Sequence, residues 1–286
     1  MNNTTKYLAF DIEISKPIPA GCIDWKTIRP VGISCAATLT NDGSAPRLWY
    51  SSENSKPAIS MTVEDVRGMI SYLHYMSTQQ GYRIITWNGL YFDFDVLAEE
   101  SQGLDELCID LAKNHTDLMF HFFCLTGYRL KLDVAAKGMG LTGKTDGMNG
   151  AKAPDIWRAG QYQQVLEYVA QDAITTMDVA IAIEQSKQVR WISKKGRPNM
   201  VAIDKWLNVA NAQKLPEPDT SWMDEPAKRS DFTDWMIYSS LKPSPRLLDY
   251  LERAFRKFQE KGQSIPDQDL FWLQRWLRMN QREKTA

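Results

Sequence analysis

The sequence predicts an α/β fold in which a mixed sheet is flanked by helices. Three apolar strand patterns come first, at residues 6–14, 29–40 and 46–52, and the turn sequence TNDGSA separates the last two. Residues 62–81 then change to a helical period, and a short buried strand at 82–87 leads directly into another helix. Antiparallel strands followed by a helix, a strand and a helix are typical of a mixed sheet with helices packed on it.

Local signals support these elements one by one. The first strand, YLAFDIEIS, places apolar side chains at every second position, as a strand with one core-facing side requires. Thr62 is an N-cap for the first helix, and Asp65 occupies the capping-box position. The helix has one apolar stripe, which consists of Val66, Met69, Ile70, Leu73 and Met76.

The second half of the chain has mainly helical patterns. Residues 104–185 are interrupted by a Gly-rich segment at 138–154, and the longest helical pattern, 161–185, has at most one break near its middle. The composition changes near residue 186, so we predict a domain over residues 1–185 and a basic, mainly helical extension over 186–286. Amphipathic helices are expected in that extension at 244–262 and 267–281.

Composition limits the cellular setting. The chain has 286 residues, 43% of them hydrophobic, and a net charge of −1, so a large core is possible and no overall charge marks a nucleic-acid binder. Four widely spaced cysteines form no zinc pattern and no disulfide framework. The first residues lack a signal-peptide pattern, and no apolar run reaches membrane-spanning length. We therefore expect a cytoplasmic protein without a membrane partner.

Two carboxylates interrupt the first strand. Asp11 and Glu13 share one face and lie about 6.5 Å apart along the strand. Like charges this close on an apolar strand need compensation, and oxygen ligands at this separation can chelate a divalent cation. The alternative is an edge strand whose acidic face meets water.

Two further patterns add acids. Asp93 follows a buried strand and an Asn-Gly turn, where open α/β folds place their chemistry, although it could be a helix N-cap and Asp95 competes for the role. Tyr168 and Asp172 are spaced i, i+4 and therefore share one face of a helix. The alternative there is a packed tyrosine beside an exposed acid.

The ordered set FDIE, NGLYFD and YVAQD resembles the three motifs of the DEDD 3′–5′ exonuclease superfamily, in its tyrosine-containing branch. The likeness covers roughly residues 5–185 and is closest to the proofreading domains of family-B DNA polymerases and their stand-alone relatives, as the segment KLDVAAKGMGLTGK also indicates. The resemblance implies a ribonuclease H-like fold. It implies that Asp11 bridges two metals, that Glu13 and Asp172 complete the first, that Asp93 holds the second through water, and that Tyr168 touches the attacking water.

The chemistry agrees with this resemblance. Two hard cations about 4 Å apart can activate water and neutralise the departing 3′ oxygen of a phosphodiester. Carboxylate ligands favour Mg²⁺ or Mn²⁺, and no His/Cys set is present to favour zinc. Tyrosine, with an ordinary pKa of about 10, is a poor general base, so we expect it to orient the water.

Residues that contact the substrate are harder to predict. Asn88 matches an asparagine near the substrate strand in the second motif, but an Asn-Gly turn explains it equally well. Phe92 and Phe94 could stack on a terminal base or belong to the core. Lys131 and Lys144 could hold a phosphate or be solvated.

Two other features have an open role. Asp117 is an additional acid on an apolar stretch, a candidate support for the site or a simple helix cap. Residues 190–206 interleave basic side chains with Trp191 and Trp206, a composition that can bind single strands or belong to a packed extension. The terminal helices could bind a protein partner or mediate self-association.

The predicted function is that of a metal-dependent 3′–5′ exonuclease that releases nucleoside monophosphates. Single-stranded DNA is favoured as substrate because the likeness is greatest to family-B proofreading domains. An exoribonuclease of RNase D type is the first alternative. A catalytically silent nucleic-acid-binding scaffold is the second, and the presence of all four acids with Tyr168 argues against it.

Overall fold

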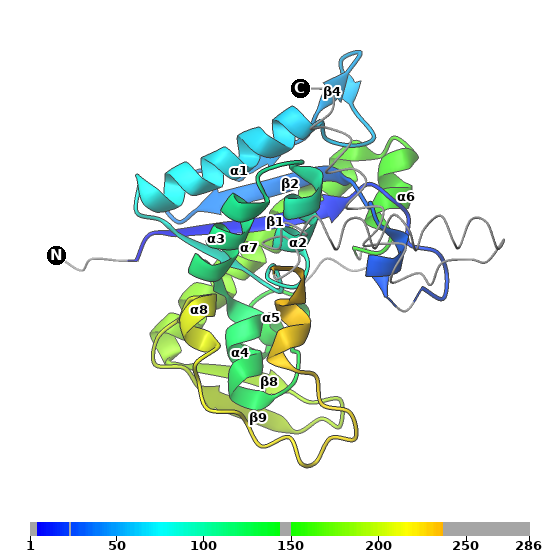
Figure 1. Cartoon of the computed structure of the whole chain (residues 1–286). Coiled ribbons are helices and arrows are strands. Elements are labelled where there is room, and N and C mark those ends of the chain that lie inside the picture. The colour runs from blue at the N-terminus through cyan, green and yellow to red at the C-terminus, as the bar shows by residue number, and fades with distance from the viewer. Residues whose placement is uncertain (1–4, 23, 144–149, 237–286) are drawn as a thin grey trace, which may run out of the picture.

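The computed structural model describes residues 5–22, 24–143 and 150–236 (Figure 1). The strands are β1 Tyr7–Ile14, β2 Ile33–Thr40, β3 Arg47–Trp49, β4 Ser52–Glu53, β5 Lys56–Pro57, β6 Arg83–Thr86, β7 Thr116–Asp117, β8 Gln188–Ile192 and β9 Pro198–Ala202. The α-helices are α1 Val63–Thr78, α2 Asp93–Glu100, α3 Asp105–Asn114, α4 Leu118–Thr126, α5 Leu132–Gly138, α6 Ala153–Arg158, α7 Tyr162–Ser186 and α8 Val209–Ala212. Two 3-10 helices are η1 Trp25–Ile28 and η2 Arg229–Phe232.

The central sheet has the strand order β3-β2-β1-β6-β7. The pairs β1–β2 and β2–β3 are antiparallel, whereas β6 runs parallel to β1 and to β7. This confirms the predicted mixed sheet and the antiparallel meander at its start. The pattern expected at 29–40 forms a strand only from Ile33, because the preceding residues form a loop that approaches α2.

Strand β1 lies in the middle of this sheet, and helices cover its side chains on both faces. Its even-numbered residues, Leu8, Phe10, Ile12 and Ile14, belong to a core shared with α1, α2, α3 and α4. Tyr7 and Ala9 belong to a second core with α5, α6 and α7. Because helices cover both faces, the alternative of an edge strand with a solvated acidic face is wrong.

The longest helix, α7, is continuous over 25 residues, so the possible break in the 161–185 pattern is absent. It packs across β1 and β2, with Val165, Val169 and Ala173 in the second core. Its C-terminal end is at Ser186, after which Lys187 adopts a left-handed conformation with φ of 58°. This crossing brings the middle of α7 over the odd-numbered face of β1.

Residues 187–236 continue the packing of the domain. The hairpin β8–β9 lies at the end of the molecule opposite α1 (Figure 1). Trp191 and Trp206 are buried in the second core, so neither ring is available to stack on a base. A Cβ on Gly138 of α5 would lie 2.0 Å from the carbonyl oxygen of Arg190, which shows how closely α5 and β8 approach.

The segment before residue 237 returns to the first core, to which Phe232 and Trp235 belong. The predicted division at residue 186 stays a prediction, and the described residues after it share both cores with those before it. The helices expected at 244–262 and 267–281 lie outside the described residues. No described helix combines the length and the apolar character needed to cross a membrane.

Candidate active site

Three carboxylates from two elements meet on the α7 side of the sheet. Asp11 and Glu13 come from β1 and Asp172 from α7, and one ligand oxygen of each lies within 4.8 Å of the other two. Glu13 and Asp172 are each 6% exposed, while Asp11 is partly exposed. Two of the three predicted motifs are thus brought together in space, although far apart in sequence.

Strand alternation explains where these acids point. Tyr7, Ala9, Asp11 and Glu13 share one face, which is apolar at its start and acidic at its end. Opposite Glu13 in the β1–β2 register lies Cys35. Burial raises the pKa of the Cys35 thiol, and the charges of Glu13 and Asp11 raise it further, as expected in a region of negative potential.

Asp93, the first residue of α2, contacts the backbone of β1 just beyond the end of its pairing with β6. Strand β6 pairs with β1 only at Tyr7–Ala9, and the Asp93 Oδ1 accepts the backbone N–H of Ile12 at 3.0 Å beyond that pairing. Burial raises the pKa of Asp93 to about 7, the bond from Ile12 opposes this, and the charges of Asp117 and Asp172 add to it. The Asp93 carboxylate therefore lies against the strand segment between Asp11 and Glu13.

The turn before Asp93 is held by Asp117, a buried acid whose role could not be decided from the sequence. Asp117 accepts the N–H groups of Asn88 at 3.0 Å and Leu90 at 2.9 Å, and it also caps α4 by accepting the N–H of Phe120. Burial raises the pKa of Asp117 to about 6, although these N–H bonds lower it. Asp117 thus combines the two roles considered for it, because it caps a helix and supports the turn that carries Asp93.

The same turn depends on Asn88 and Gly89. Asn88 adopts a left-handed conformation with φ of 74°, which asparagine tolerates better than most residues. A Cβ on Gly89 would lie 2.5 Å from Thr86 Oγ1, so a side chain has no room there. The turn explanation of the Asn-Gly pair is therefore supported by the geometry.

A hydrogen-bonded chain continues from this turn into the core. Gly89 N–H donates to Thr86 Oγ1, which lies 3.0 Å from His115 Nε2. His115 Nδ1 lies 2.7 Å from the Ala112 carbonyl, which can only accept, so Nδ1 carries the proton and Nε2 accepts from Thr86. Burial lowers the pKa of His115 to about 3, which keeps the ring neutral in the folded protein.

Asp95, the competing acid in the second motif, points away from the cluster. It is 1% exposed and forms an ion pair with Arg29, and Lys26 Nζ lies 3.6 Å from its Oδ2. Arg29 also pairs with Glu99 at 3.1 Å. The loop between β1 and β2 therefore neutralises Asp95, whereas Asp93 remains with the acids.

The remaining predicted residues differ in how the structure places them. Tyr168 is 6% exposed and lies one turn before Asp172 on the same face of α7. Phe94 is fully buried against Phe10, as the core alternative expects, while Phe92 is partly buried. Lys144 lies outside the described residues.

The Gly-rich segment also approaches the acids. An added Cβ at Gly150 would lie 3.7 Å from Glu13 Oε2, an ordinary contact distance. Lys131 is exposed at the start of α5. The glycines of this segment match no known phosphate-binding loop, so the sequence did not indicate that residue 150 borders Glu13.

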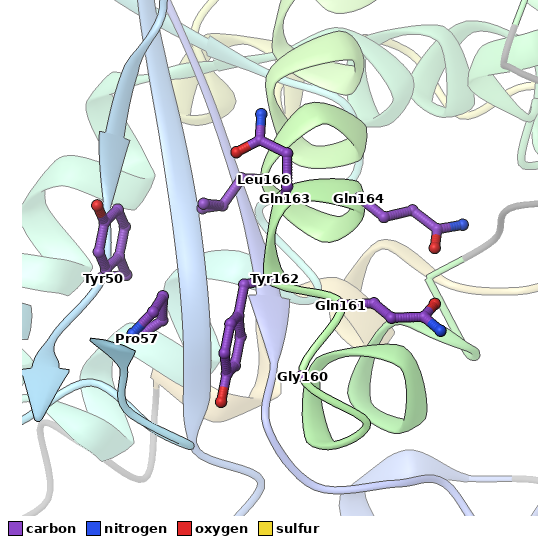
Figure 2. Close-up of a pocket in the computed structure, with 8 residues that line it drawn as sticks. All are labelled: Tyr50, Pro57, Gly160, Gln161, Tyr162, Gln163, Gln164 and Leu166. Carbon is purple, nitrogen blue, oxygen red and sulfur yellow. The ribbon is translucent and has the colours of Figure 1, made fainter. Parts of the chain in front are cut away.

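A pocket of about 550 Å³ lies at the N-terminal turn of α7, apart from the acids. Figure 2 shows Tyr162 and Leu166 on the side of α7 that faces Tyr50 and Pro57, and Gln161 and Gln164 directed to the other side. None of its lining residues is charged. The pocket therefore offers no carboxylate ligand for a cation.

The acid cluster fits hard divalent cations. Its ligand atoms are all carboxylate oxygens, which Mg²⁺ and Mn²⁺ prefer. Buried like charges at this separation are unfavourable without a counter-charge. Asp11, Glu13 and Asp172 would hold one cation, and Asp93 lies beside them on the backbone N–H of Ile12.

Two comparisons with known proteins found a similarity. Residues 47–183 match the model of the RNase_H superfamily, a range that includes Asp93, Tyr168 and Asp172 and begins after β1 and β2. The fold is similar to the family B DNA polymerase from the hyperthermophilic archaeon Pyrobaculum calidifontis, with a TM-score of 0.44 and 18% sequence identity, over 63% of this chain and 24% of the polymerase chain. No curated protein sequence matches the chain. The match over residues 47–183 and the mixed five-stranded sheet flanked by helices are those of an RNase H-like fold.

Proposed function

We propose that this protein is a metal-dependent 3′–5′ exonuclease that hydrolyses single-stranded DNA and releases nucleoside monophosphates. The observation that carries the proposal is the convergence of Asp11, Glu13 and Asp172 within 4.8 Å, with Asp93 bonded to the strand between the first two. The match of residues 47–183 to the RNase_H superfamily indicates a nuclease. The order of the three motifs supports the exonuclease assignment within that class.

The protein residues have distinct tasks in this proposal. Asp11, Glu13, Asp93 and Asp172 hold two divalent cations, which would activate water and neutralise charge on the departing 3′ oxygen. Strand β1 keeps Asp11 and Glu13 rigid because both of its faces are packed. Tyr168 projects from the same face of α7 as Asp172 and orients the water by hydrogen bonding.

The preference for DNA rests on the likeness of the motifs to family-B proofreading domains. We infer that the strand enters with its 3′ end at the acids and that Asn88 and Phe92 border it, because both belong to the turn and helix start that carry Asp93. An RNA strand would be distinguished at its 2′-hydroxyls. A direct comparison of the two polymers therefore tests the substrate assignment.

The test uses labelled single strands of DNA and RNA with equal sequence, incubated with Mg²⁺ or Mn²⁺. We expect stepwise shortening of the DNA from its 3′ end, and no shortening with EDTA or with the Asp11→Ala variant. Faster shortening of RNA would assign the enzyme to the exoribonucleases. Failure to shorten either polymer with either metal would refute the enzyme assignment in favour of a binding scaffold.

A further inference from the structure

Tyr91 lies two residues before Asp93 and carries two cations on its ring. Lys26 Nζ lies 4.7 Å from the ring centroid, and Arg129 Cζ lies 4.5 Å from it. The Trp25 ring meets Tyr91 and Phe92 edge-on, with centroids 6.3 Å and 4.8 Å away. These five residues, Trp25, Lys26, Tyr91, Phe92 and Arg129, are called the Tyr91 patch below.

The patch is assembled from three separate segments, and hydrogen bonds fix two of them. The η1 helix presents Trp25 and Lys26, and the Asp24 carboxylate caps it by accepting the Lys26 N–H. Arg129 follows the C-terminal end of α4, and the neighbouring Leu130 carbonyl accepts Trp87 Nε1–H at 2.9 Å. The bond from Trp87 holds the segment around Arg129 beside the turn that leads to Tyr91.

Lys26 and Arg129 differ in how their charge is offset. Arg129 is exposed and forms no ion pair with a carboxylate in the described part of the chain. Lys26 pairs with Asp95 at 3.6 Å, and it shares this carboxylate with Arg29. Arg129 is therefore the cation of the patch that is left to bind an external anion, and Lys26 adds positive charge beside the same ring.

The position and the composition of the patch favour the phosphates of a nucleic-acid strand as the anion that it binds. It borders Asp93, where the proposed function places a phosphodiester, and it combines cations with partly exposed aromatic rings. Binding sites for single-stranded nucleic acids pair cations for the phosphates with rings for the bases. An acidic peptide would use the cations but would leave the rings without planar partners.

We propose that the Tyr91 patch binds the phosphates of the substrate strand next to the bond that is cleaved, with Arg129 as the phosphate contact and Lys26 as a second positive charge beside the same ring. The inference rests on the proposed function, because the direction of the strand is set by the acids. It adds residues of the β1–β2 loop and of the segment after α4, which lie outside the three motifs. The patch therefore sets affinity for a polymer and leaves the chemistry of a single phosphodiester to the acids.

The test measures strand binding separately from cleavage. Fluorescence anisotropy of a labelled oligothymidylate is recorded at several salt concentrations in an Asp11→Asn background, and Arg129→Gln and Lys26→Gln are added to it. We expect Arg129→Gln to weaken binding about three- to tenfold and to reduce the slope of log K against log salt by about 0.7, the value for one lost single-strand phosphate contact, and Lys26→Gln to weaken it less. Arg129→Lys should restore most of the affinity. The matched control is Lys113→Gln, which removes one positive charge from an exposed position on α3.

A second measurement uses the p-nitrophenyl ester of thymidine 5′-monophosphate, a phosphodiester with a single nucleoside. Arg129→Gln in the otherwise native protein should lose more kcat/KM on an oligonucleotide than on this ester, mainly through a raised KM. Equal binding and an equal salt slope in the Gln variants and in Lys113→Gln would overturn the inference. If the native protein cleaves neither substrate, the proposed function fails, and the anisotropy series still decides whether the patch binds a strand.

Discussion

The two faces of β1 have the same backbone and the same neighbours in the sheet, but they serve different purposes. The face with Leu8, Phe10, Ile12 and Ile14 is apolar along its whole length and packs under α1, α2 and α3. The opposite face begins with Tyr7 and Ala9 and then changes to two acids beneath α7. One face therefore packs the strand into the core, while the second half of the other face carries the acids that the proposed function assigns to cations.

The largest effect is expected on the acidic face. Asp11→Asn and Asp172→Asn should each lower the rate of DNA shortening by more than about a thousandfold, because each removes a ligand from the cluster and metal-ion catalysis supplies several kcal/mol. Without metal, both variants should be at least as resistant to thermal unfolding as the native protein, since one of several repelling charges is gone. Rate measurements in Mg²⁺ and melting curves in EDTA test the two halves of this prediction. A variant that melts well below the native protein would show that the acid has a structural role.

The apolar face should respond in the opposite way. Phe10 is 1% exposed, and its ring centroid lies 6.0 Å from that of Phe94. Phe10→Ala should lower the free energy of unfolding by about 3–5 kcal/mol, the usual cost of truncating a buried aromatic residue. Urea unfolding measures this loss. The milder Phe10→Leu variant should remain folded and keep a nearly native rate, and a large loss of rate in that folded variant would break the contrast between the two faces.

Asp117 should show an intermediate effect because it belongs to the support of the site. Asp117→Ala leaves the N–H groups of Asn88, Leu90 and Phe120 without their acceptor, at a cost of about 1–3 kcal/mol for a buried donor. We expect it to be destabilised and to need more Mg²⁺ for half-maximal activity, since the turn before Asp93 loses its anchor. Asp117→Asn keeps one acceptor oxygen and should be affected less. Equal metal requirements in the native and Asp117→Asn proteins, with a lowered melting temperature, would limit Asp117 to helix capping.

The smallest effect concerns pH and His115, which is 2% exposed. Its folded pKa of about 3 lies below the ordinary value of about 6.5, so its contribution to stability is complete above pH 6.5 and is lost as the pH falls toward 3. The raised pKa of Asp117, about 6, opposes this loss because the folded protein gains that proton first.

Comparison with a His115 variant isolates the contribution of this histidine to the pH dependence of stability. His115→Gln should be less stable than the native protein at pH 7.5, and the difference between the two free energies of unfolding should shrink as the pH falls from 6.5 to 4.5. Urea unfolding at several pH values gives this difference directly. A difference that stays constant with pH would mean that His115 titrates alike in the folded and unfolded chains.

The sequence predicted the parts of this molecule that depend on short-range patterns. Alternation in YLAFDIEIS placed Asp11 and Glu13 on one face of a strand, and the capping signal at Thr62 located the start of α1. The order of the motifs led to a ribonuclease H-like fold, which the structure and the family match confirm. The ligand assignments themselves stay predictions until metal binding is measured.

Features that depend on distant contacts were beyond the reach of pattern reading. The motif resemblance favoured Asp93 over Asp95, but the pairing of Asp95 with Arg29 from another loop could not be read from the sequence. Trp191 and Trp206 lie in a basic segment that is typical of strand binders, yet both are buried under α7 and α5. Composition reports what a segment contains, whereas burial depends on what folds against it.

The dispersal of the acids along the chain has a consequence for synthesis. Asp11 and Glu13 leave the ribosome early, Asp93 follows after β6, and Asp172 is added only when most of α7 has been made. A chain that is still shorter than α7 holds an incomplete ligand set, and its long-range strand and helix contacts have yet to form. If the proposed function holds, hydrolytic activity requires completion of the domain, and a fragment that ends before α7 should be harmless to nucleic acids.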